Sequence, residues 1–147
     1  MVSLTRLTRK KIGEILVEQG LLTDAQVQDT LRLQHQTGLL FGETLVQNRL
    51  ITEDKMVSVL VAQFGIPYLR PSQYKIPKEL LDIFEPAMMR RYQFVPMDMV
   101  GSVLVIAVAG LLSEDILKEI ETQTGCTLQV FLTKMSEIGD VLKANGL

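Results

Sequence analysis

Apolar and polar positions follow the same order twice between residues 11 and 63. The block KIGEILVEQGLLTDAQVQDTLRLQ (11–34) and the block LFGETLVQNRLITEDKMVSVLVAQ (40–63) align without a gap, with eight identities in 24 positions and a period of 29 residues. A repeat this short cannot bury its apolar face alone, because each copy depends on its neighbour for cover. The pattern therefore predicts two copies that pack against each other as one unit.

Each block predicts a helix, a tight turn and a second helix. In the first block Ile12 and Leu16 lie four residues apart, so they share one helical face. Gly20 stands where a helix needs a residue of left-handed conformation to end. Thr23 is a typical N-cap for the second helix, and Gln26 stands at the capping-box position.

The second block departs from the first at its turn. Arg49 occupies the position of Gly20, and a side chain disfavours the left-handed conformation. Asn48 tolerates that conformation better, so we expect the first helix of this copy to end one residue earlier. Thr52 repeats the N-cap of Thr23.

The pattern changes after the repeat. Pro67, Pro71 and Pro77, with few helix formers between them, predict a linker. A β-branched and nearly continuous apolar stretch, preceded by a turn at Gly101-Ser102, predicts the second arm of a β-hairpin. The expected elements are short helices from about 78 and 86, strands at 94–100, 103–109 and 127–132, a helix capped by Ser113, and a last helix at 136–144.

These elements predict an α+β fold. A tandem helical-hairpin repeat of four helices is followed by a small three-stranded α+β subdomain, with its helices against one face of the sheet. The expected boundaries are residues 1–66 for the helical subdomain, 67–77 for the linker and 78–147 for the α+β subdomain.

Charge and hydropathy narrow the classes of partner. The net charge is -2 and the pI about 5.4, whereas a nucleic-acid-binding domain usually carries a basic excess. The one basic cluster, at positions 6 and 9–11, is either a solvated helix start or a contact for phosphate or lipid headgroups. The longest apolar run, 103–112, is about half as long as a membrane-spanning helix, and no secretory signal is present. We therefore expect a cytoplasmic protein without a transmembrane segment that binds no nucleic acid.

Motifs of catalysis are missing from the sequence. Neither G-x-x-x-x-G-K-[ST] nor G-x-G-x-x-G occurs, so we expect no ATP hydrolysis by this chain. The single His35 and the single Cys126 cannot supply a set of zinc ligands. We therefore expect no catalytic residue, no metal site and no cofactor, and any parent ATPase domain would lie C-terminal to this chain.

The duplicated pattern resembles a known family. The motif R-L-G-x-x-L-[LV]-x-x-G-L-[LI]-x-x-x-x-L-x-x-x-L-x-x-Q, written twice with a five-residue spacer, is similar to that of the N-terminal, MshEN-like domain of type II secretion and type IV pilus assembly ATPases, the general-secretion E/pilus B group. The likeness continues in the same order through Gly65-Ile66-Pro67-Tyr68, Arg90-Arg91-Tyr92 and Thr124-Gly125-Cys126.

The resemblance implies a cytoplasmic, non-catalytic module that sits ahead of a hexameric ATPase. Such a module docks the ATPase to the cytoplasmic domain of an inner-membrane platform protein, so the chain would be peripheral at the inner membrane through its partners. In one branch of the family the paired motifs bind cyclic di-GMP, which makes a cyclic di-GMP sensor the alternative function. A purely structural pair of helical hairpins is the third interpretation.

Carried over position by position, the family motif predicts ligand contacts in both blocks. The basic residue before each glycine would contact phosphate or guanine, the glycines would allow close approach of the backbone, and the terminal glutamines would donate and accept hydrogen bonds. In the second block Leu40 replaces the basic residue, and Arg49 replaces the second glycine. The candidate cyclic di-GMP residues are Lys11, Ile12, Gly13, Leu16, Gly20, Leu21, Gln34, Phe41, Gly42, Leu45, Arg49, Leu50 and Gln63.

Overall fold

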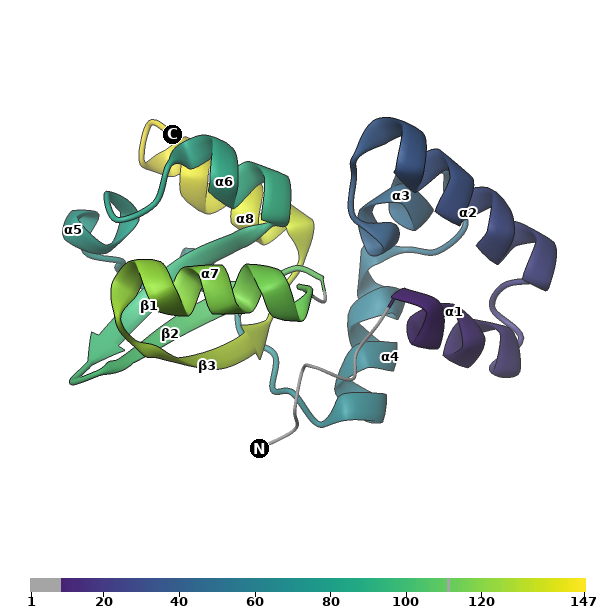
Figure 1. Ribbon diagram of the computed structural model, residues 1–147, viewed down its shortest axis with the longest axis horizontal. Helices are drawn as coiled ribbons and strands as arrows, with labels where there is room; N and C mark the ends of the chain where they lie inside the picture. The colour runs from purple at the N-terminus through teal and green to yellow at the C-terminus, as the bar shows by residue number, and fades with distance from the viewer. Residues whose placement is uncertain (1–8, 111) are drawn as a thin grey trace.

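The computed structural model describes residues 9–110 and 112–147, with side chains from residue 12 onward. These residues form eight α-helices, one short 3-10 helix and a three-stranded sheet (Figure 1). In chain order the elements are α1 (Arg9–Glu18), α2 (Asp24–Thr37), α3 (Phe41–Gln47), α4 (Glu53–Phe64), η2 (Pro71–Gln73), α5 (Lys78–Leu81), α6 (Pro86–Tyr92), β1 (Phe94–Val100), β2 (Val103–Val108), α7 (Glu114–Thr124), β3 (Thr127–Leu132) and α8 (Met135–Ala144). The contacts expected for the basic side chains at positions 6 and 9–11 lie outside the described residues.

The molecule has two halves, which Figure 1 shows side by side. Helices α1 to α4 form the repeat half (residues 9–64), in which α1 with α2 and α3 with α4 are the two predicted helical hairpins. The sheet and helices α5 to α8 form the sheet half (residues 67–147). The predicted α+β fold class is confirmed.

The turns inside the two hairpins have the same backbone conformation. Gly20 has φ 72° and Arg49 has φ 58°, both left-handed. In each turn the next amide donates to the carbonyl four residues before the left-handed residue, at 2.9 Å in the first copy and 3.0 Å in the second. Asn48 has φ -87°, so the expectation that it would take the left-handed position was wrong. The hydrogen-bond pattern of the repeat fixes the conformation at position 49 and overrides the preference of the side chain.

Threonine caps begin the second helix of each hairpin. The Gln26 amide donates to Thr23 Oγ1 at 3.1 Å, and the Thr23 amide donates to Gln26 Oε1 at 2.9 Å. In the second copy the Lys55 amide donates to Thr52 Oγ1 at 3.1 Å. The capping box and both N-caps predicted from the sequence are confirmed. Each cap satisfies an amide that the start of a helix leaves without a partner.

The sheet has the strand order β1-β2-β3. β1 and β2 form the predicted antiparallel hairpin, whose register shifts between Pro96 and Asp98. β3 runs parallel to β2, and α7 makes the crossover between them. The three predicted strands are confirmed, with β2 ending at Val108, one residue earlier than expected.

Both faces of the sheet are covered at one end. Residues 94–97 of β1 and residues 106–108 of β2 are all buried. Because successive residues of a strand point to opposite faces, an unbroken buried run requires cover on both sides. The expectation that helices would lie against one face only was therefore wrong.

The predicted linker, residues 67–77, is hydrogen-bonded to the sheet half. The Leu69 amide donates to the Leu132 carbonyl at 3.0 Å, and the Leu132 amide donates to the Pro67 carbonyl at 2.9 Å. Tyr68 forms a parallel bridge with Leu132 between these two bonds. The segment thus extends the sheet beyond β3, while the subdomain boundaries given above remain predictions.

Candidate functional site

The glycines that begin the two motifs have different surroundings. A Cβ atom on Gly13 of α1 would lie 2.8 Å from Cγ1 of Val27 on α2, closer than carbon atoms pack. A Cβ atom on Gly42 of α3 would meet only Cε of Met56, at 3.6 Å, which is an ordinary contact. Gly13 is therefore needed for the close approach of α1 and α2, whereas Gly42 leaves room for a small side chain.

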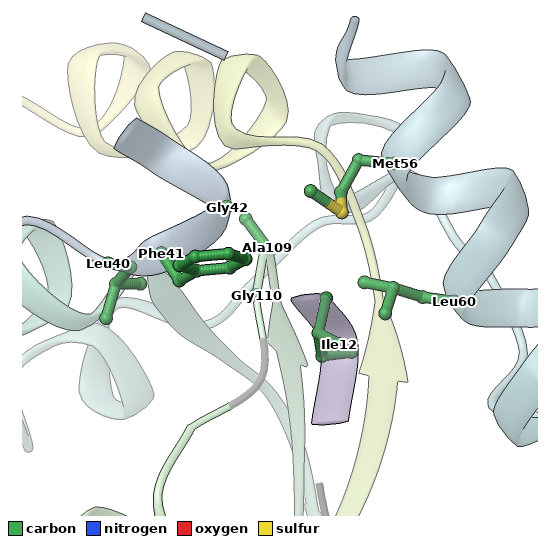
Figure 2. Close-up of a pocket in the computed structure, with 8 residues that line it drawn as sticks. All are labelled: Ile12, Leu40, Phe41, Gly42, Met56, Leu60, Ala109 and Gly110. Carbon is green, nitrogen blue, oxygen red and sulfur yellow. The ribbon is translucent and has the colours of Figure 1, made fainter. Parts of the chain in front are cut away.

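Three of the predicted residues, Ile12, Phe41 and Gly42, line one small cavity (Figure 2). In Figure 2 Ile12, Phe41 and the two α4 side chains surround it, and the backbone after β2 closes one side. The cavity therefore lies between the repeat half and the sheet half. The other lining residues are Leu40, Met56, Leu60, Ala109 and Gly110.

This cavity is too small to enclose a nucleotide. Its volume is about 40 Å³, whereas ligand pockets are usually about 300–1,000 Å³. All its side chains are apolar, so none of them can donate a hydrogen bond to a phosphate or a guanine. A nucleotide bound to the repeat half would therefore lie on its surface.

The two motif-ending glutamines are not equivalent in the structure. Gln34 is 7% exposed, on the buried face of α2 with Val27 and Thr30. Among the described residues, nothing donates a hydrogen bond to its buried Oε1 atom. Gln63 is exposed on α4. A buried amide oxygen without a partner is unfavourable, and such groups in folded proteins usually bind water or a ligand.

The remaining candidates divide by exposure. Leu16 and Leu45 are fully buried, Leu21 and Leu50 are half-buried, and Gly20 and Arg49 are exposed at their turns. The buried leucines belong to the core of the repeat half and have no free surface for a ligand. The side chain of Lys11 lies outside the described residues.

Glu43, in the first turn of α3, carries a carboxyl group that sequence reasoning did not single out. Burial raises the pKa of this carboxyl above its usual value, and the hydrogen bond from the Leu40 amide, at 3.3 Å, opposes the rise only in part. Its position three residues after Leu40, the N-cap of α3, was the available signal, because a glutamate there reaches back to the N-cap amide.

A wide groove of about 760 Å³ runs between α4 and α8, away from the predicted residues. In its wall Nε of Arg70 donates to Oε1 of Glu137 at 2.8 Å, and the Ser72 amide donates to Oε2 at 3.0 Å. Burial raises the pKa of Glu137, but the hydrogen bonds from Ser72 and Arg70 outweigh burial and hold it below its ordinary value. Sequence reasoning missed this groove because Arg70 and Glu137 are 67 positions apart and no local motif joins them.

Within residues 9–110 and 112–147, no cluster of three or more His, Cys, Asp or Glu side chains could hold a metal ion. None of the helices in these ranges combines the length and the hydropathy that crossing a bilayer requires.

A family model described as the MshEN domain matches residues 64–145. The match spans more than half of the chain, from the last residue of α4 through α8. The chain belongs to the MshEN domain family. The matched residues follow the duplicated blocks, so this assignment is independent of the repeat, and the resemblance noted from the sequence is confirmed.

Two curated relatives are type IV pilus assembly ATPases named PilB. The protein of Thermus thermophilus is 26% identical over 129 residues, which are 86% of this chain and 14% of that protein. The protein of Myxococcus xanthus is 20% identical over 133 residues, which are 90% of this chain and 24% of that protein. The chain thus spans less than a quarter of the length of either relative.

Solved structures share the fold along nearly the whole chain. The structure of MshE with cdg, the abbreviation of cyclic di-GMP, has a TM-score of 0.65 at 20% identity and covers 90% of this chain and 96% of that one. Two crystal structures of the N-terminal domain of XpsE have TM-scores of 0.64 and 0.71 at 18% identity, and each covers 92% of this chain. The two XpsE chains are themselves covered to 95% and 94%. The α+β architecture is therefore that of this group of domains.

Proposed function

We propose that this chain is a non-catalytic docking and regulatory domain of a type IV pilus assembly or type II secretion ATPase. It binds the cytoplasmic domain of an inner-membrane platform protein and is peripheral at that membrane through this partner. The observation that supports the proposal is the fold shared with the N-terminal domain of XpsE over 92% of the chain, together with the MshEN match. The PilB relatives are several times longer, so ATP hydrolysis is assigned to their remaining residues.

A pull-down tests the docking function directly. The 147-residue chain, immobilised, should retain the purified cytoplasmic domain of the cognate platform protein. In the parent ATPase, deletion of these residues should abolish pilus assembly or secretion while ATP hydrolysis by the remaining protein persists. Assembly that continues after the deletion contradicts the proposal.

A second candidate function is cyclic di-GMP binding by the repeat half. It is supported by the structure of MshE with cyclic di-GMP and by the buried amide oxygen of Gln34, which lacks a partner among the described residues. The first copy keeps Gly13 and Gly20, whereas the second has Leu40 and Arg49 at the positions of the basic residue and the second glycine. We therefore assign binding to the first copy, with the Gln34 amide as its hydrogen-bonding group.

Titration calorimetry tests this second function. The unmodified chain should release or absorb heat on addition of cyclic di-GMP, and Gln34→Ala should abolish the signal. Gln36→Ala is the matched control, because Gln36 lies on the same helix with its side chain exposed. No heat from the unmodified chain at ligand concentrations on the order of tens of micromolar contradicts cyclic di-GMP binding and leaves the docking function intact.

A further inference from the structure

Charged groups at the beginnings of α4 and α8 connect the two halves. The Ser136 amide, in the first turn of α8, donates to Oε1 of Glu53 at 2.9 Å. The Lys134 ammonium forms an ion pair with the Asp54 carboxylate. Lys134 is the N-cap of α8, and its side chain accepts no hydrogen bond from the first turn of that helix. Glu53 therefore supplies from the repeat half the cap that α8 lacks.

Packing beside these contacts is incomplete. Gly42 and Met56 of the repeat half and Ala109 of the sheet half line the cavity of about 40 Å³, and Met56 and Thr133 are among the residues that line a second one of about 10 Å³. The Thr133 hydroxyl is fully buried and has no hydrogen-bond partner among the described residues. Gaps forfeit dispersion contacts and an unpaired hydroxyl is unfavourable, so these features reduce the stabilisation that packing between the halves provides.

The segment that connects the two halves begins with a glycine. Gly65 follows α4 directly, has φ 64° and is exposed. A Cβ atom placed there would meet nothing within 4 Å, and the Gly65 amide donates to the Val61 carbonyl of α4 at 2.9 Å. Hinges in proteins are a few residues at the ends of elements that absorb backbone rotation.

We propose that Glu53, Asp54 and Lys134 form an electrostatic latch that holds the repeat half and the sheet half in the orientation of Figure 1, and that its release allows the halves to move about Gly65. A partner or ligand with unequal affinity for the latched and released forms shifts the balance between them. The latch does not depend on the docking function or on cyclic di-GMP binding.

The latch is accessible to water and therefore sensitive to salt. The side chain of Asp54 is 77% exposed and that of Lys134 is 33% exposed. Asp54 raises the pKa of Lys134, so the ammonium stays charged at neutral pH. Ion pairs between exposed groups are weak and are screened within about 3 Å at 1 M salt. High salt should consequently release the latch without any mutation.

Pulsed spin-label distance measurements on the full 147-residue chain test the proposal. Labels are attached through Gln28→Cys on α2 and Lys118→Cys on α7, both exposed, in a Cys126→Ala background. The latch variant is Glu53→Ala with Asp54→Ala, which removes both side-chain acceptors. The control variant, Glu114→Ala with Asp115→Ala, makes the same change in the first turn of α7 and removes no contact between the halves.

At low salt the labelled chain and the control variant should give one narrow distance distribution. The latch variant, and the chain with intact charges in 1 M sodium chloride, should give a distribution at least about twice as wide. Circular dichroism checks that the latch variant is folded, and if it is not, the salt series decides alone. A distribution that stays narrow in 1 M salt, or in a folded latch variant, overturns the latch, and so does equal broadening in the control variant.

Discussion

Equivalent residues of the two repeat copies contribute differently to the fold. Gly13 lies in the close contact between α1 and Val27 of α2, whereas a Cβ atom on Gly42 would make only an ordinary contact with Met56. Gly20 and Arg49 share a left-handed backbone although only one of them is glycine. The duplicated backbone is thus kept more strictly than the side chains, so substitutions at equivalent positions should have opposite effects on stability.

Alanine at the two motif glycines tests this directly. Gly13→Ala should lower the free energy of unfolding by about 1–2 kcal/mol, because overpacking against Val27 exceeds the gain in helix propensity. Gly42→Ala should raise it by up to about 1 kcal/mol, since its new methyl group makes only an ordinary contact with Met56. Urea unfolding measures both, each serving as control for the other. Changes of the same sign would contradict the packing described here.

Arg49 pays a conformational cost that glycine would remove. Its φ of 58° is unfavourable for a residue with a Cβ atom by about 1–2 kcal/mol, so Arg49→Gly should raise the free energy of unfolding by about 1 kcal/mol. Gln47→Gly, in the last turn of α3, should instead lower it by about 0.5–1 kcal/mol. Urea unfolding of both variants is the measurement, and a destabilised Arg49→Gly chain disproves the strain.

Features of single residues could be predicted where they depend on residues close in the sequence. The capping box of Thr23 and Gln26 follows from residues three positions apart, and it was found from the sequence. The left-handed Arg49 was missed because propensity favours Asn48. The sequence also did not predict that Gln34 is buried while Gln63 is exposed, because burial depends on contacts between elements.

The helices and strands themselves were more predictable than the contacts between them. Periods of 3.6 and 2 residues are local, and the four repeat helices and three strands follow them. Cover on both faces of the sheet, and the bonds from Pro67 and Leu69 to Leu132, depend on elements far apart in the chain. The same holds for the groove between α4 and α8, because the bond from Arg70 to Glu137 in its wall joins residues 67 positions apart.

The attachment of α8 to the linker should weaken in acid. Hydrogen bonds from Ser72 and Arg70 hold the pKa of Glu137 below 4.5, so the ionised carboxylate is favoured in the folded state. This stabilisation is complete above the ordinary pKa of 4.5 and is lost as the pH falls through the lowered value. Glu137→Gln should therefore cost about 1–3 kcal/mol at pH 7 and less at pH 3.

Urea unfolding at pH 7 and pH 3 measures this difference. Glu119→Gln, exposed on α7, is the control and should match the unmodified chain at both pH values within about 0.5 kcal/mol. A Glu137→Gln deficit that is as large at pH 3 as at pH 7 would show that the side chain stabilises the fold by shape and not by charge.

The whole molecule combines a duplicated helical half with a sheet half that carries the family match. Both halves contribute residues to the cavity of Figure 2 and to the latch between α4 and α8, so both features depend on how the halves are placed relative to each other. Relatives that match this chain are ATPases of much greater length. We propose that this chain recognises a partner by a folded surface and that the remainder of such proteins carries out the chemistry.

The most direct test of that assignment is an equilibrium binding titration. The purified 147-residue chain is titrated with the cytoplasmic domain of the cognate inner-membrane platform protein at low and at high salt. We expect saturable one-to-one binding with a Kd on the order of 1–10 µM or lower. No binding at concentrations of about 100 µM, with both proteins folded, would contradict it.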